Sequence, residues 1–455
     1  MNELFSIARM SGGAAACTPA LMIAAALACL PAALAAEDLR GAYRRSRESS
    51  PMVARAQALV DAARARGDVK RAALLPHLAA AAGVKRGDAK VEGLGTPIDG
   101  AYNGNRYSVT LRQPIIDGQD WSEVRAARDD EAAARQALLA AEQVLIGDVF
   151  TAYFTVLQAR ADAEVAASYR ELMQRTLAQA QAFLKVGSGD IISVREAQAR
   201  SDGAEARMVR AQNAVRVAER ALERLTHAPA GRLADVAVFE ARGPEPDDAA
   251  LWLASAERNQ PILQQAARLL EASEARAEAA RRARWPRLSL MADYSRSKGE
   301  FIPPLESRGG QAGLELTLPI FQGGAIGAEI ARAEAESRAR RQELLEVQDQ
   351  VQLDVQTAFL NLQSSTAEMR AADQALRSAE TSVAAMRRGY EIGSRSVVDL
   401  LGSIENYTAA QREFFTARYR HLLARVGLKQ ASGVLSEADV DAVNSLLQTK
   451  ETETR

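Results

Sequence analysis

Hydrophobic positions recur every seven residues through two long segments that contain no proline, residues 119–185 and 325–391. In the second segment the apolar series is Val355, Leu362, Met369, Leu376 and Val383, and the series three residues later is Ala358, Ser365, Ala372, Ala379 and Met386. The first segment keeps this register, and only Arg170 interrupts it. Such spacing is typical of coiled coils. About 67 residues make a helix about 100 Å long, which needs lateral packing along its length. Alanine at alternate layers favours a curved wall of antiparallel helices over a lone dimeric rod.

Each predicted long helix ends at a short turn that contains glycine. The two turns are Val186-Gly187-Ser188 and Ile392-Gly393-Ser394. Glycine supplies the left-handed conformation that closes a helix C-terminus, so the chain reverses its direction there. Return helices of about 35 to 40 residues are expected to end near Thr226 and Ala431. The sequence therefore predicts two long helical hairpins.

Alternation with a period of two replaces the helical period in four shorter segments, which we expect to be strands of about 9 to 11 residues. Three alternate clearly, around residues 107–112, 288–295 and 312–318, and the fourth, residues 78–85, is rich in alanine and weakly patterned. This length lets a tilted strand cross a membrane. Two interpretations remain open, namely an antiparallel sheet packed on a core or a barrel wall that faces lipid.

Four strands cannot close a barrel, and an open sheet edge in a bilayer leaves backbone groups unpaired. A membrane barrel would therefore need several chains, and three chains would give twelve strands. Aromatic residues are expected near the strand ends, as interfacial aromatics would be: Tyr102, Tyr107, Tyr294 and Phe301. Residues 90–105 and 298–310 carry glycine, proline and polar residues, as outward-facing loops do.

The chain repeats itself once. Ser50-Pro51 and Gln260-Pro261 begin similar helical stretches 210 positions apart, and Gln113-Pro114-Ile115 matches Leu318-Pro319-Ile320 at an offset of 205. The glycine turns match at 206. A period this long is an internal duplication of a whole module of helix, two strands and helical hairpin.

The N-terminus has the pattern of an export signal. An apolar run over residues 20–33 follows Arg9 and ends at the small-residue cleavage site Ala33-Leu34-Ala35. The mature chain should start at Ala36 or Glu37, outside the cytoplasm. An alternative makes Cys29 a lipidated N-terminus.

Charge and composition exclude several classes of function. The 57 Lys+Arg against 58 Asp+Glu give a net charge of −1 and no basic block for nucleic acid. Both cysteines, Cys17 and Cys29, precede the predicted cleavage site, and His77, His227 and His421 have no partner at metal-ligand spacing. We therefore expect no metal, no cofactor and no enzymatic activity.

These features together resemble the TolC family of outer-membrane channel-tunnels, and the resemblance covers nearly the whole mature chain. It rests on the signal peptide, the duplication, the paired strands and the run Gly389-Tyr390-Glu391-Ile392-Gly393-Ser394-Arg395-Ser396-Val397-Val398-Asp399-Leu400-Leu401. The resemblance implies a mainly α protein with a membrane β-barrel. It implies a homotrimer whose twelve-stranded barrel, four strands per chain, lies in outer-membrane lipid and continues as an α-helical barrel across the periplasm.

The resemblance also implies partners and a division of the chain. The partners are a periplasmic adaptor (a membrane fusion protein) and an inner-membrane ABC transporter or other pump. The divisions are a signal peptide at residues 1–35, a first outer membrane efflux protein repeat at 36–228, a connecting equatorial segment at 229–247, a second repeat at 248–432 and an equatorial tail at 433–455. The two glycine turns would be the tips that dock on the adaptor.

The resemblance implies gating residues, of which some have a counterpart in this sequence and others do not. The tyrosine, arginine and first aspartate that tie helices together at the periplasmic entrance are matched by Tyr390, Arg395 and Asp399. Gly402 stands where the family has a second aspartate, and Ser193 stands where the first copy would supply an aspartate to the arginine. Asp190, about one turn earlier, is a substitute partner for Arg395.

The run from Ala417 to Glu437 is most similar to family members that serve type I protein secretion. Small-molecule or multidrug efflux is the alternative within the family. A periplasmic coiled-coil scaffold or adaptor is the alternative from another class, but adaptors usually carry one hairpin and this sequence has two. An enzyme finds no support, because no phosphate-binding loop or nucleophile arrangement is present.

Overall fold

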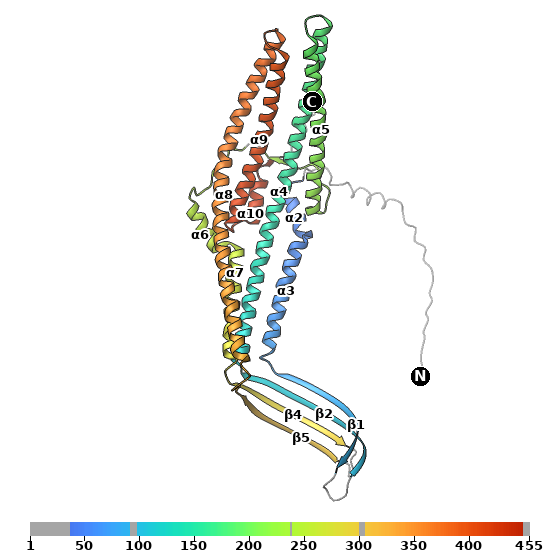
Figure 1. Cartoon of the computed structure of the whole chain (residues 1–455), viewed down its shortest axis with the longest axis vertical. Helices are drawn as coiled ribbons and strands as arrows, with labels where there is room; N and C mark the ends of the chain where they lie inside the picture. The colour runs from blue at the N-terminus through green and yellow to red at the C-terminus, as the bar shows by residue number, and fades with distance from the viewer. Residues whose placement is uncertain (1–36, 92–97, 237–238, 300–304, 449–455) are drawn as a thin grey trace, which may run out of the picture.

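The computed structural model describes residues 37–91, 98–236, 239–299 and 305–448. The chain is elongated, with long helices at one end and a curved sheet at the other (Figure 1). The predicted export signal, Cys29 and Phe301 lie outside the described residues.

In the described residues, each half of the chain contributes four helices. The first half holds α2 (Leu39–Ser49), α3 (Pro51–Ala72), α4 (Gly118–Lys185) and α5 (Ile191–Thr226). The second half holds α6 (Ala249–Asn259), α7 (Pro261–Arg282), α8 (Ala325–Glu391) and α9 (Val397–Ala431), and α10 (Glu437–Asn444) follows. The long helices span 68 and 67 residues and the return helices 36 and 35, so the duplication is visible in the fold. The two predicted hairpins are confirmed, and each bound lies within one residue of its expected place.

Local sequence explains where the helices begin. The Asp117 carboxylate accepts a hydrogen bond of 3.0 Å from the backbone N–H of Asp120 and caps α4. The Ser50 hydroxyl caps α3, and prolines at the first helical position open both α3 and α7. A cap satisfies N–H groups that have no partner within the helix, and proline there loses no hydrogen bond.

Four strands form one antiparallel sheet in the order β1-β2-β4-β5. They are β1 (His77–Val91), β2 (Ile98–Ile116), β4 (Arg287–Gly299) and β5 (Leu305–Thr317). The predicted length of about 9 to 11 residues was wrong, because the strands run for 13 to 19 residues. Most of the expected loops, residues 90–105 and 298–310, are strand as well. Each strand of a hairpin satisfies the backbone of its neighbour, so glycine and polar residues stay in the ladder despite their loop-like composition.

The expected place of Tyr107 and Tyr294 near strand ends was also wrong. Tyr107 lies opposite Ala82 and Arg296, and Tyr294 lies opposite Val109 and Gly310, in both cases well inside the sheet. The strands continue past these residues for the reason just given, so the tyrosines do not mark strand ends.

The two faces of the sheet differ in chemistry. Register places Leu78, Leu111, Ala292 and Ala312 in one row, so side chains two positions apart share a face. One face carries Leu78, Val84, Val109, Leu111, Tyr294, Leu314 and Leu316, and the other carries Ser108, Thr110, Arg112, Ser289, Asp293, Ser295, Glu315 and Thr317. No described helix lies against either face (Figure 1), and Leu78, Leu314 and Leu316 are 72%, 65% and 68% exposed. The interpretation as a sheet packed on a core is therefore wrong, and the apolar face has the composition of a lipid-facing barrel wall.

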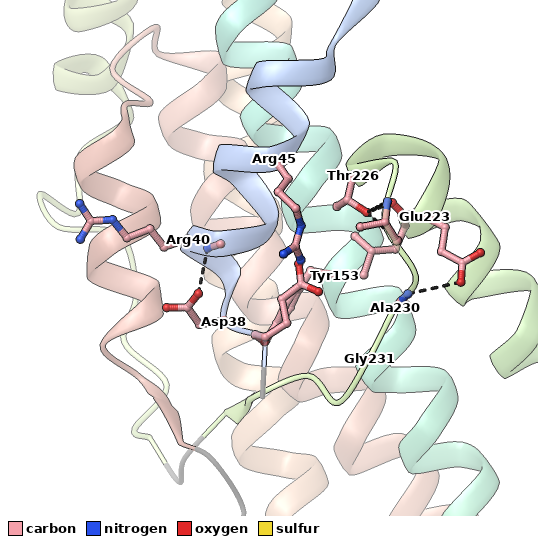
Figure 2. A network of polar contacts seen from close by, with 12 residues as sticks. Asp38, Arg40, Arg45, Tyr153, Glu223, Thr226, Ala230 and Gly231 are labelled. Carbon is pink, nitrogen blue, oxygen red and sulfur yellow. Dashed lines mark hydrogen bonds and ion pairs between the residues drawn. The ribbon is translucent and has the colours of Figure 1, made fainter. Parts of the chain in front are cut away.

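The largest core lies at the waist of the helices. Tyr153, Phe154 and Tyr419 are fully buried there, where α2, α4 and α9 meet. The segment between the two halves crosses this core, because β3 (Asp235–Val236) pairs with β6 (Leu447–Gln448) near the C-terminus. The Tyr153 hydroxyl donates to the Ala234 carbonyl oxygen at 2.7 Å, and neighbouring contacts fasten the same crossing chain to α5 (Figure 2). The waist therefore holds both halves in one unit.

Candidate functional site at the helical tips

The hairpin tips, opposite the sheet in Figure 1, close with the same hydrogen bonds in both halves. Gly187 and Gly393 have the same positive φ of 75°. The Ser188 N–H donates to the Phe183 carbonyl at 3.0 Å, and the Ser394 N–H donates to the Gly389 carbonyl at 2.9 Å. Only glycine adopts this left-handed conformation without a steric cost, so the paired glycines fix both reversals.

Both return helices have a carboxylate that caps the N-terminus, Asp190 at the N-cap of α5 and Asp399 in the first turn of α9. Asp190 accepts from the Ser193 N–H at 2.7 Å and from the Ser193 hydroxyl at 2.9 Å. Asp399 accepts from the Ser396 hydroxyl at 2.8 Å and from the Ser396 N–H at 3.1 Å. These hydrogen bonds favour the charged form and lower the pKa of each carboxyl group. Both aspartates are therefore anionic across the physiological pH range.

A groove of about 470 Å³ separates the tips of the two hairpins and brings four of the five predicted gate residues together. Its lining includes Asp190, Ser193, Tyr390 and Arg395. The Tyr390 ring packs on Phe183 of the other hairpin, with ring centroids 5.8 Å apart. Burial and the charge of Asp190 raise the pKa of Tyr390. The phenol is therefore a neutral hydrogen-bond donor beside a carboxylate.

Arg395 lies across the last turn of α8. A Cβ added at Gly389 would lie 2.7 Å from the Arg395 Cγ, so the absence of a side chain at Gly389 makes room for this stem. Within the described single chain no ion pair joins Arg395 to Asp190, whose oxygens bond to Ser193. Arg395 instead lies near enough to Asp399 to contribute to its lowered pKa. Gly402, at the position of the missing aspartate, faces open space.

An ionic cluster, which sequence analysis missed, joins the return helices further from the tips. Glu405 on α9 accepts from Arg200 at 2.5 Å and from Arg207 at 2.6 Å, both on α5. Arg207 also lies over the Tyr169 ring, 5.1 Å from its centroid. The sequence contained a signal for this ionic cluster, because Arg200 and Glu405 occupy nearly equivalent places in the duplicated halves and carry opposite charges. Equivalent helices of a duplicated hairpin can face one another across its symmetry axis.

Apolar side chains are exposed around the tip turns. Val186, Ile192 and Ile392 are 76%, 74% and 80% exposed. Below them, Met173, Leu400 and Ile404 form a small buried core between the hairpins, and Tyr390 packs against it. Among the described residues no group of three or more histidine, cysteine, aspartate or glutamate side chains is placed to hold a metal ion. The tips therefore combine exposed apolar side chains with a groove between the two hairpins.

Comparisons with known proteins agree with this architecture. The family profile described as outer membrane efflux protein matches residues 42–227 and 252–434, which is most of the chain. Outer membrane protein TolC of Escherichia coli (strain K12) is 29% identical over 428 residues, covering 90% of this chain and 85% of TolC. The alkaline protease secretion protein AprF of Pseudomonas aeruginosa is 28% identical over 429 residues, covering 91% and 88%.

A solved structure shares the fold. The CmeC outer membrane channel of Campylobacter jejuni superposes with a TM-score of 0.79 at 17% identity, covering 90% of each chain. The two faces of the sheet and the duplicated hairpins suit such a channel, with the sheet in the membrane and the helices in the periplasm. The chain belongs to the outer membrane efflux protein family, and it is a TolC-like channel of the outer membrane whose helical tunnel lies in the periplasm.

Proposed function

We propose that the chain forms a homotrimeric channel-tunnel for type I protein secretion. A periplasmic adaptor and an inner-membrane ABC transporter would pass the cargo into it. The observation that carries the secretion subtype is the likeness to AprF, a protein named for alkaline protease secretion, along 91% of this chain. The route needs no chemistry at the tunnel wall, only a passage and a closure at the tips.

Sheet geometry supports the trimer. One chain leaves the outer edges of β1 and β5 unpaired in the described sheet. In a bilayer each unpaired backbone group costs several kcal/mol, so edges of neighbouring chains must pair. Three copies give twelve strands, an even number that a membrane barrel can close.

The tip residues are proposed to form the entrance. Tyr390, Arg395 and Asp190 line the groove between the hairpins, and threefold repetition would bring further copies of them around one axis. In the trimer, Arg395 of one protomer would meet Asp190 or Ser193 of its neighbour, because no ion pair holds it within the described chain. Val186, Gly187 and Ser188, with Ile392, Gly393 and Ser394, would contact the adaptor through their exposed apolar surface.

Two transport assays test the secretion subtype. The full chain is produced in a Gram-negative host that lacks its own channel, together with either an ABC transporter, its adaptor and a secreted protease, or a proton-driven drug pump and its adaptor. We expect protease activity in the medium and little gain in drug resistance. Drug resistance without protease secretion would overturn the subtype, and the double variant V186D/I392D should abolish whichever transport occurs, because it charges the docking surface.

A further inference from the structure

Basic side chains gather on the lipid-facing side of the sheet, close to the end furthest from the helices. Arg296 on β4 lies opposite Tyr107 and Arg308. Lys298, two residues further along, lies opposite Asn105 and Glu306. All of these positions share the face that carries Leu111, Val109 and Tyr294. Each lies an even number of residues from one of these three along its own strand, or directly opposite such a position.

Their height along the barrel places them at a membrane boundary. From Leu288 to Arg296 the strand rises about 27 Å, or about 20 Å along the membrane normal at a tilt of about 40°. The apolar band of a membrane barrel is about 25 Å tall. Counted from Leu288 as the lower end of this band, Arg296 lies about 5 Å below the upper end, from where its long side chain reaches the headgroups of the outer leaflet. It does not lie at the bilayer centre, where a lipid-facing arginine would be costly.

The cluster has more positive than negative charge. Arg296 pairs with Glu306, with an Nη2–Oε1 distance of 2.5 Å. Arg86 lies on the same face. In the described part of the chain, Arg86, Lys298 and Arg308 have no ion pair. Asp88 is the other acid described on this face, so four cations stand against two anions. Two arginines directly opposite each other destabilise a sheet unless an anion lies between them.

An apolar groove of about 350 Å³ lies directly beside these cations. Its floor is made by Ala80 and Ala82 of β1, and its walls include Tyr107, Val109 and Tyr294. The groove exists because alanines on β1 stand opposite large side chains on β2. Tyr107 is the direct cross-strand neighbour of Arg296, so the groove and the basic cluster are continuous.

We propose that this surface is a binding site for a phosphorylated, multiply acylated lipid of the outer leaflet. Arg308, Lys298 and Arg296 contact its phosphate groups, and an acyl chain lies in the groove between Tyr107 and Tyr294. The combination selects the occupant, since an acidic protein would leave the groove empty and an uncharged lipid would leave the cations unpaired. The site would fix the barrel in the outer leaflet and neutralise the facing arginines.

Native mass spectrometry of the full chain, extracted from outer membranes, tests the site. The protein is incubated with diphosphoryl lipid A, with the same lipid after dephosphorylation, or with phosphatidylglycerol, and the bound lipid is counted. The test variant is R308Q/K298Q. The matched control is R106Q/K85Q, which removes the same charge at the same height from the opposite, polar face. A third variant, A82F, fills the groove and leaves the cations in place.

Each basic residue beside an anionic membrane surface strengthens binding about fivefold, so R308Q/K298Q should weaken lipid A binding about 25-fold. The control should bind as the wild type does, and A82F should bind more weakly. Variants are compared only when their oligomeric mass equals that of the wild type, and the single variant R308Q replaces the double one if that one fails to assemble. Equal losses in test and control, or equal binding of the dephosphorylated lipid or phosphatidylglycerol, would overturn the proposal.

Discussion

Replacing Glu405 with glutamine should loosen the closed entrance. The Glu405 carboxylate joins Arg200 and Arg207 across the two hairpins at 2.5 and 2.6 Å. These side chains are 32%, 39% and 41% exposed, so each ion pair is partly screened by water and contributes about 0.5 to 1 kcal/mol. Glutamine keeps the shape and one acceptor oxygen but removes the charge.

The expected loss is about 1 kcal/mol per protomer, or about fivefold in the ratio of closed to open entrances. If three protomers open together, about 3 kcal/mol is lost and the ratio changes about 100-fold. Single-channel conductance in planar bilayers measures this directly. The open-state fraction of E405Q should rise, and high salt should raise that of the wild type, because salt screens the same pairs.

A matched control separates gating from general loss of charge. Glu171 pairs with Arg175 at 2.5 Å within the single helix α4, and both side chains are largely exposed. E171Q therefore removes an ion pair without unlinking the hairpins, and its conductance should equal that of the wild type. Equal conductance of E405Q and wild type, or an equal rise in both variants, would refute a role of this cluster in closure.

Three further predictions concern other parts of the helical wall. Arg395→Ser should raise conductance, and combined with E405Q it should raise conductance further. An unchanged conductance would show that Arg395 takes no part in closing the entrance. Gly433→Ala should lower the free energy of unfolding, measured by thermal unfolding, by at least about 2 kcal/mol, because φ is 72° and a Cβ would lie 2.5 Å from the Gln260 Cα. The control Gly427→Ala should not destabilise the protein, because a Cβ at Gly427 faces open space. Burial and two nearby arginines lower the pKa of His421 to about 4, so protonation of this imidazole opposes folding. The free energy of unfolding should therefore fall by about 2 kcal/mol between pH 7 and pH 5, and His421→Phe should remove that part of the pH dependence.

The helices could be predicted closely from the sequence, because a heptad pattern without proline leaves few places to end. Glycine turns at residues 187 and 393 then fixed the hairpins. The strands were harder, because their outer halves have the composition of loops and stay extended only through pairing with a neighbour. Period-two alternation marked the faces correctly but not the length.

The tip residues, too, could be predicted from the sequence only in part. The resemblance to the TolC family pointed to Tyr390 and Arg395, and Asp190 was predicted as a substitute partner for Arg395; the structure brings all three to one groove. Glu405 escaped notice because a lone glutamate on a helix has the pattern of a solvated side chain. Its partners lie about 200 residues away, and the nearly equivalent places of Arg200 and Glu405 in the two halves were the signal in the sequence that α5 and α9 face each other.

Stability is distributed unevenly along the helical wall, and this distribution explains how an entrance could open without unfolding the protein. The waist holds fully buried aromatic side chains such as Tyr153, Phe154 and Tyr419. Beyond Ala372, no side chain in the remaining turns of α8 is buried in the single chain. Those turns are held by partly buried contacts, in which Val383, Met386 and Tyr390 pack against the small core below the tips. Regions with few buried apolar contacts open at low free energy, so the tip half of α8 can move while the waist and the sheet keep their packing.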